Sequence, residues 1–133
     1  SMSDEELEPY IATLKERIER RQRRSELDDG ALEQRAHKLN QQYFEGSLQW
    51  ASMRWVTNQD KRHGSCTPTR ATIRISHRIA TMPQFVQDYV IVHELAHLIE
   101  PNHSRKFWAL VYRYPKAERA RGYLMAVGLE DAI

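Results

Sequence analysis

Two histidines and a glutamate in one short stretch, His93-Glu94-Leu95-Ala96-His97, have the types and spacing of a metal centre. Four residues advance an α-helix by about 400°, so the two imidazoles would lie about 40° apart on one face, one turn above the other. Both rings can then reach one tetrahedral zinc ion. Glu94 would project beside the ion, where its carboxylate can accept a proton from bound water whose pKa zinc lowers to about 7. The motif predicts His93 and His97 as metal ligands and Glu94 as the catalytic base.

A third protein ligand is needed if a catalytic zinc ion is to keep one position open for water or substrate. His103 lies six residues after His97, just beyond Pro101 and Asn102, which end the helical pattern. This break lets the chain turn back and bring a loop imidazole to the same ion. We therefore expect His93, His97 and His103 to hold one zinc ion.

The motif also has an interpretation without a metal. An isolated HExxH pattern can arise by chance, and a histidine on an apolar helix face is more often a core residue than a ligand. Here the pattern lies in a helix expected to be buried, and burying two imidazoles and a carboxylate without a metal would be costly. We therefore favour metal binding.

The other histidines and the single cysteine have weaker signals. His63 lies where a strand could border the cleft, and it is a candidate contact for substrate. His77 follows a predicted strand and is ambiguous, whereas His37 lies on the exposed side of a charged helix. Cys66 has neither the spacing nor a partner of a zinc ligand, so we interpret it as a buried strand residue.

The HExxH motif lies in the strongest predicted helix, which begins near Pro83 and ends near Ile99. The segment is apolar over much of its circumference, so it should be the buried central helix. Ser104 can cap a further helix over 105 to about 114, and a last helix runs from 116 to about 127.

The first half of the chain predicts helices followed by strands. Residues 4–24 form a highly charged helix with one narrow apolar stripe, and a second helix covers about 30–45. Residues 52–57 and 71–76 alternate as strands do, which indicates two or three antiparallel strands. The pattern predicts an α+β fold with a charged N-terminal helical extension over 1–30 and a single domain over 31–133.

Composition restricts the class of protein. A chain of 133 residues with 41% apolar and 29% charged residues fits one globular domain. Cys66 is its only cysteine, and its polar N-terminus shows no secretory signal, so we expect a reducing, cytoplasmic setting. No apolar stretch is long enough for a membrane span, and a net charge of +2 does not by itself imply nucleic-acid binding.

A series of short motifs extends from Tyr43 to about Trp108. They are Tyr43-Phe44-x-Gly46, Arg54-Trp55, Arg62-His63-Gly64-Ser65-Cys66, Ile73-Arg74-Ile75-Ser76, the segment 88–97 and Asn102-His103-Ser104-x-x-Phe107-Trp108. In their order and spacing these motifs resemble the YgjP-type metallopeptidase-like domain. The resemblance implies a compact zincin fold with a small antiparallel sheet, a third histidine ligand from the loop after the HExxH helix, and kinship with SprT-like proteases. The chain departs from the family pattern at His63, where a tryptophan is usual, and the match does not cover residues 4–24.

Two other zincin classes are compatible with parts of the pattern. Metzincins share the interval from His97 to His103, but Glu100 stands where they need glycine. They also need a Met-turn, whereas Met125 lies in a helical pattern and is expected in the core. Gluzincins use a glutamate from a later helix, for which Glu118 is the candidate. His103 is the better third ligand.

Three functions remain open from the sequence. The first is hydrolysis of a peptide bond, with an extended substrate held at a strand edge near Ala71–Ser76. The second is hydrolysis of a nucleoside triphosphate to its monophosphate and pyrophosphate on the same zinc site, an activity attributed to some YgjP-type proteins. That reaction could use four arginines around the strands: Arg62, Arg70, Arg74 and Arg78. The third is association with nucleic acid through basic segments at 15–24 and 105–121.

Overall fold

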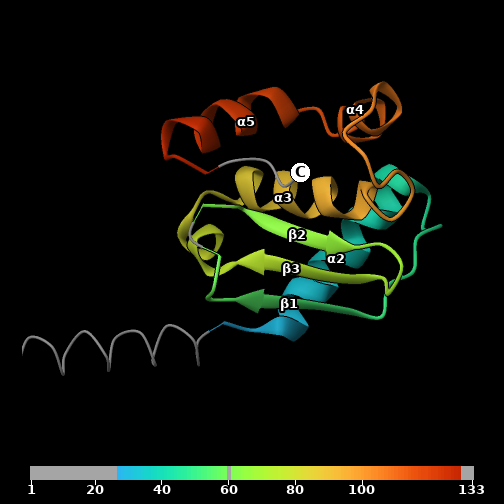
Figure 1. Ribbon diagram of the computed structural model, residues 1–133, viewed down its shortest axis with the longest axis horizontal. Helices are drawn as coiled ribbons and strands as arrows, with labels where there is room; N and C mark the ends of the chain where they lie inside the picture. Colours follow the sequence, from blue (N-terminus) through green and yellow to red (C-terminus); the bar gives the residue numbers. More distant parts are fainter. Residues whose placement is uncertain (1–26, 60, 130–133) are drawn as a thin grey trace, which may run out of the picture.

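The structure, a computed structural model, describes residues 27–59 and 61–129. The charged helix predicted at residues 4–24 lies outside the described residues. Along the described chain the elements are α2 (Asp29–Phe44), β1 (Ser52–Val56), β2 (Gly64–Thr67), β3 (Thr72–Ser76), the 3-10 helix η1 (His77–Thr81), α3 (Gln84–Ala96), α4 (Arg105–Val111) and α5 (Ala117–Ala126) (Figure 1). The predicted α+β class is confirmed.

The three strands form a mixed sheet in the order β1-β3-β2. Strand β3 pairs antiparallel with β2 and parallel with β1. The prediction of an antiparallel sheet was therefore wrong for one of the two pairings. The chain reverses between β1 and β2 and again between β2 and β3, so β1 and β3 run in the same direction. They become neighbours because β3 lies between the other two strands.

The position of β3 also corrects the predicted substrate edge. Residues 72–76 have a hydrogen-bonded strand on both sides, so no extended peptide can add there. Among the strands that the structure describes, β2 pairs only with β3. The edge strand on the α3 side is therefore β2 (Figure 1).

Helix α3 is the centre of the fold. It packs against α2 and against the sheet, and α4 and α5 cover it on its other side (Figure 1). Every side chain from Asp88 to Ala96 is buried, including those of His93 and Glu94. This placement follows from a segment that is apolar around most of its circumference. The sequence prediction of a buried central helix is confirmed.

Local signals set the ends of the helices. The Ser104 hydroxyl accepts a hydrogen bond from the Phe107 N–H at 3.2 Å, as expected for the cap of α4. Helix α2 ends at Phe44, and the next two residues, Glu45 and Gly46, both have positive φ angles. Met125, expected in the core, is 75% exposed on α5. The prediction that Met125 lies in a helix was correct, but its side chain is on the solvent-exposed face of α5.

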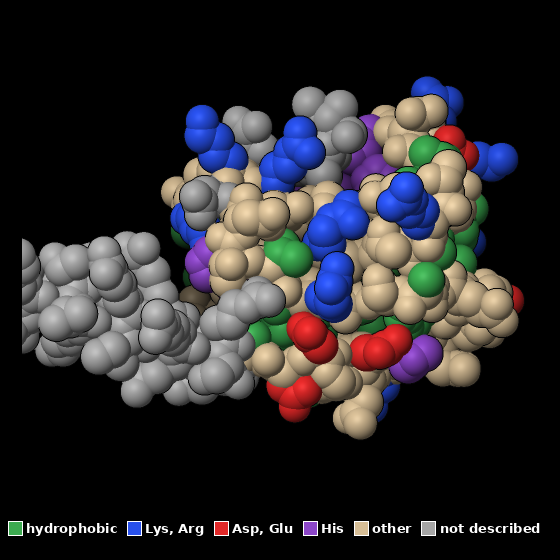
Figure 2. All heavy atoms as spheres, turned by 60° about the horizontal axis from the view of Figure 1, so that its bottom comes forward, with side chains coloured by type: hydrophobic (Ala, Val, Ile, Leu, Met, Phe, Trp, Pro, Cys, Tyr) green, Lys and Arg blue, Asp and Glu red, His purple; other side chains and the backbone are tan. Residues whose placement is uncertain are grey.

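The face of the sheet opposite α2 and α3 carries cationic side chains. Arg54 and Arg74 lie opposite each other in the β1–β3 register. Figure 2 turns the lower side of the molecule in Figure 1 toward the viewer. Lys and Arg side chains gather over the middle of this view.

No described helix is long and apolar enough to span a membrane.

Candidate metal centre

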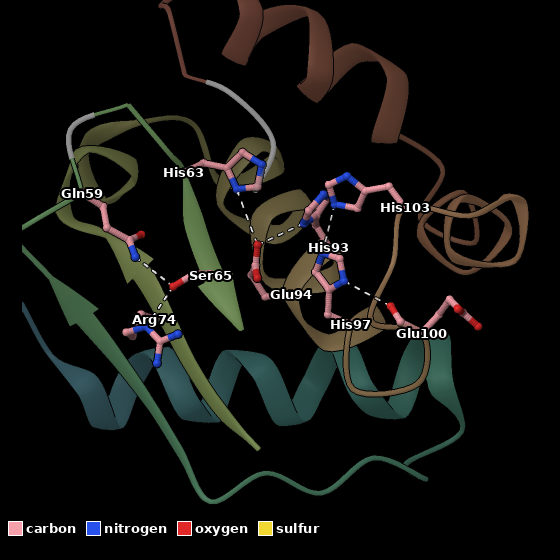
Figure 3. Close-up of polar contacts among 9 residues, drawn as sticks. All are labelled: Gln59, His63, Ser65, Arg74, His93, Glu94, His97, Glu100 and His103. Atoms are coloured by element: carbon pink, nitrogen blue, oxygen red, sulfur yellow. Dashed lines mark hydrogen bonds and ion pairs between the residues drawn. The ribbon is translucent and has the colours of Figure 1, made fainter. Parts of the chain in front are cut away.

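The C-terminal half of α3 and the loop that follows it bring three histidines together (Figure 3). His93 and His97 lie one helical turn apart, and both are buried. His103 is half-buried in the loop between α3 and α4. One ligand atom from each of the three residues lies within 4.8 Å of the other two. The residues predicted as ligands therefore form one cluster.

The closest contact in this cluster joins two ring nitrogens. His103 Nε2 lies 3.1 Å from His97 Nε2. Two nitrogens bound to one tetrahedral zinc ion at 2.0–2.1 Å are separated by about 3.3 Å. The observed separation is close to that value, so this pair of donors fits a shared metal ion.

The tautomer of His97 is set by its other nitrogen. His97 Nδ1 lies 3.1 Å from the carbonyl oxygen of Glu100, which can only accept, so Nδ1 carries the proton in the neutral ring. Nε2 then has the lone pair that a metal needs. Burial lowers the pKa of His97, against a smaller opposing effect of the Glu94 carboxylate. Burial therefore favours the neutral ring, and the contact with Glu100 leaves Nε2 of that ring available to a metal ion.

An aromatic side chain from α4 packs against all three imidazoles. The Phe107 ring stacks on His97 with centroids 4.3 Å apart and lies 4.8 Å from His103 and 4.9 Å from His93. Phe107 is fully buried. The loop histidine is thus held by packing as well as by its nitrogen contacts.

Glu94 lies beside the histidine cluster, between two imidazole rings (Figure 3). Its Oε1 is 3.0 Å from Nδ1 of His93 and 3.9 Å from Nδ1 of His63. All three side chains are fully buried. Strand β2 approaches this carboxylate closely because Gly64 has no side chain: a Cβ there would lie 3.4 Å from Glu94 Cγ and 2.8 Å from the Arg74 carbonyl oxygen.

His63 is the residue that sequence reasoning located least well. It was expected at the border of the cleft, whereas its ring is fully buried against Tyr89, His93 and Glu94. The sequence does contain one signal for this burial, because His63 directly precedes Gly64. A glycine in a strand often marks a place where another segment approaches closely.

The remaining candidates lie apart from the three histidines. Glu118 is exposed in the first turn of α5 and belongs to neither of the potential metal-binding groups among the described residues. His37 is exposed, and its ring lies tilted against Trp50 with centroids 4.5 Å apart. His77 begins η1 and also lies outside both groups.

Cys66 and Arg74 lie on opposite faces of the sheet. Cys66 is half-buried in β2, where burial, with a smaller effect of Glu94, raises its thiol pKa to about 12. The Arg74 guanidinium donates to the hydroxyls of Ser65, Thr67 and Thr72 on the outer face. Arg74 therefore points away from Glu94 and is not a cleft residue.

The model of the YgjP-like metallopeptidase domain family matches residues 4–126. The chain belongs to this family. The match confirms the resemblance inferred from the motifs and extends it over residues 4–24. The predicted boundary at residue 30, between an N-terminal extension and the domain over 31–133, stays a prediction.

A solved structure supports the fold. The chain is similar to the crystal structure of the metallopeptidase zymogen of abylysin from Pyrococcus abyssi, with a TM-score of 0.64 and 19% sequence identity. The similarity covers 76% of this chain and 99% of that chain. No curated protein sequence matches the chain significantly.

Proposed function

We propose that this chain is a zinc metallopeptidase in which His93, His97 and His103 hold the metal ion and Glu94 is the catalytic base. The observation that carries the proposal is the pair of facing nitrogens on His97 and His103, 3.1 Å apart, next to a buried carboxylate. Three neutral imidazoles are a donor set that zinc prefers, and they leave one position open. The family supports a peptidase.

Glu94 carries out the proton transfers in this mechanism. When bound, zinc would polarise the scissile carbonyl and make a water molecule more acidic. The Glu94 carboxylate accepts a proton from the attacking water and later delivers it to the leaving amine. Nδ1 of His93 is 3.0 Å from Glu94 Oε1, which leaves Nε2 as the ligand atom that we assign to His93.

Strand β2 is the element that we expect to bind substrate. Ser76 N–H donates to the His63 carbonyl at 2.9 Å, so in an antiparallel ladder the backbone groups of Gly64 and Cys66 point away from β3. An extended peptide can add to this edge by main-chain hydrogen bonds. Because Gly64 lies against Glu94, the peptide bond would pass close to the base.

The phosphoanhydride alternative has no comparable support in the described residues. It needs cationic side chains facing the metal, and Arg74 lies on the outer face of the sheet. Association with nucleic acid has no comparable support in the described residues either. Arg113 lies over Phe44 and donates to the Tyr43 carbonyl, whereas Arg119 lies over Phe85.

The test compares both substrate classes on one preparation. The zinc-loaded full chain is incubated in parallel with an unfolded protein and with nucleoside triphosphates, and Glu94→Gln serves as the control for contaminating enzymes. We expect cleavage of the unfolded protein by the native chain and none by the variant. Release of pyrophosphate without cleavage of protein would contradict the proposal.

A further inference from the structure

His63 lies on the opposite side of the Glu94 carboxylate from His97 and His103 (Figure 3). Its Nδ1 is 3.9 Å from Glu94 Oε1, the same oxygen that lies 3.0 Å from His93 Nδ1. The mechanism proposed above uses His93 and Glu94 but gives no task to His63. A second imidazole beside the catalytic carboxylate is therefore unexplained by that function.

The position of His63 is fixed by its surroundings. Its carbonyl oxygen accepts a hydrogen bond from Ser76 N–H at 2.9 Å, which ties its backbone to the end of β3. Its ring meets His93 edge-on at 4.8 Å and Tyr89 at 6.1 Å between centroids. The ring is therefore held in place next to the carboxylate, as a ligand side chain must be.

We propose that His63 and Glu94, with His93 beside them, form a second divalent-metal site, whose occupation inhibits the enzyme. One ligand atom from each of the three residues lies within 4.8 Å of the other two, and all three are buried. Two donors on one tetrahedral zinc ion are separated by about 3.3 Å. The separation between His63 Nδ1 and Glu94 Oε1 is 3.9 Å, so the two side chains have to move slightly closer together when they bind the ion.

A second ion would inhibit the enzyme because Glu94 is both a ligand of that ion and the catalytic base. A carboxylate oxygen that binds a metal ion cannot also accept a proton from water, so Glu94 serves one role at a time. His93 is already a ligand of the first ion through Nε2, so His63 and Glu94 are the two side chains left to bind the second ion. The second ion therefore has fewer protein ligands than the first and is repelled by its charge, so its site is the weaker one. This inference rests on the proposed function for its consequence, whereas the binding itself can be measured without activity.

The experiment counts zinc ions on the metal-free full chain by calorimetric titration. The variant His63→Phe keeps a buried aromatic ring but removes both nitrogens. The matched control is His37→Gln, which removes an exposed histidine outside both groups. Glu94→Gln is a second variant of the site, because an amide is a poor zinc ligand.

We expect two equivalents of zinc for the native chain and for His37→Gln, with the second bound about tenfold or more weakly. His63→Phe and Glu94→Gln should keep the first equivalent, which also shows that they fold, and lose the second. Excess zinc should lower the peptidase activity of the native chain by a larger factor than that of His63→Phe.

A single equivalent in the native chain, or a second equivalent that persists in both site variants, would overturn the second site. Failure of the proposed function is distinguishable from this result. In that case either the tight equivalent would be missing or the zinc-loaded chain would not cleave protein, whatever the His63-dependent equivalent does.

Discussion

His97 and His103 face each other with their Nε2 atoms 3.1 Å apart, although one ends α3 and the other lies in the loop before α4. The contact needs the helix to stop at the right residue and the loop to return over its end. Glu100 takes part in this turn by accepting from His97 Nδ1. The pair thus links the helix end, the tautomer of one ligand and the position of the other.

Replacement of Glu94 by glutamine should separate metal binding from catalysis. The amide keeps the shape of the side chain but cannot accept a proton at neutral pH, so kcat should fall by about 10²–10⁴. The three histidines are unchanged, so the tight equivalent of zinc should remain. Near-normal turnover by the zinc-loaded variant would show that Glu94 is not the base.

His103 and Glu118 distinguish the two candidate third ligands. His103→Ala should weaken zinc binding by about 10- to 1000-fold, because two imidazoles remain. Glu118→Ala should leave the affinity nearly unchanged, since Glu118 is exposed and outside the metal-binding groups. Competition with a chelator measures both affinities. The opposite pattern would assign the ligand to Glu118.

Gly64 and Gly122 make a matched pair for testing the approach of β2 to Glu94. A Cβ at Gly64 would meet the Arg74 carbonyl at 2.8 Å, so Gly64→Ala should destabilise the fold by about 1–3 kcal/mol and reduce activity. Gly122 lies in α5 with nothing within 4 Å of an added Cβ, so Gly122→Ala should stabilise the helix by up to about 1 kcal/mol. Denaturant unfolding measures both. Equal stability of the two variants would contradict the close packing at Gly64.

Cys66 should be protected from alkylation near neutral pH. Burial raises its pKa to about 12, so little thiolate forms in the native chain at pH 8. Reaction with iodoacetamide should be at least about tenfold slower than in the unfolded chain.

The same shift has a consequence for stability. Because the unfolded thiol ionises near pH 9.0 and the folded one near 12, stability should fall as pH rises through this window. Over this pH range a Cys66→Ser variant should lose less stability than the native chain. Rapid alkylation of the native chain at pH 8 would contradict the raised pKa of the thiol.

The sequence predicts best what depends on local spacing. The apolar circumference of residues 84–96 defines the central helix, and Ser104 followed by Phe107 defines the cap of α4. Both rest on contacts within a few residues. The gathering of His93, His97 and His103 also needs only one helix and the turn after it.

Features that depend on distant pairing could not be predicted. Alternation in 52–57 and 71–76 indicates strands but not their order, because β3 could pair with β1 in either direction until the path of β2 is known. The burial of His63 against Glu94 depends on that same order. The outward direction of Arg74, by contrast, follows from the alternation itself, because Ile73 and Ile75 are buried on the other face of the strand.

The central claim is that three histidines hold one zinc ion, and the zinc content of His97→Ala tests it most directly. Native chain and variant are dialysed together against buffer that contains no added zinc, and the metal is counted by elemental analysis. We predict about one zinc per native chain and almost none in the variant, because the facing nitrogen pair is lost. A full complement of zinc in His97→Ala would contradict the assignment of this metal centre.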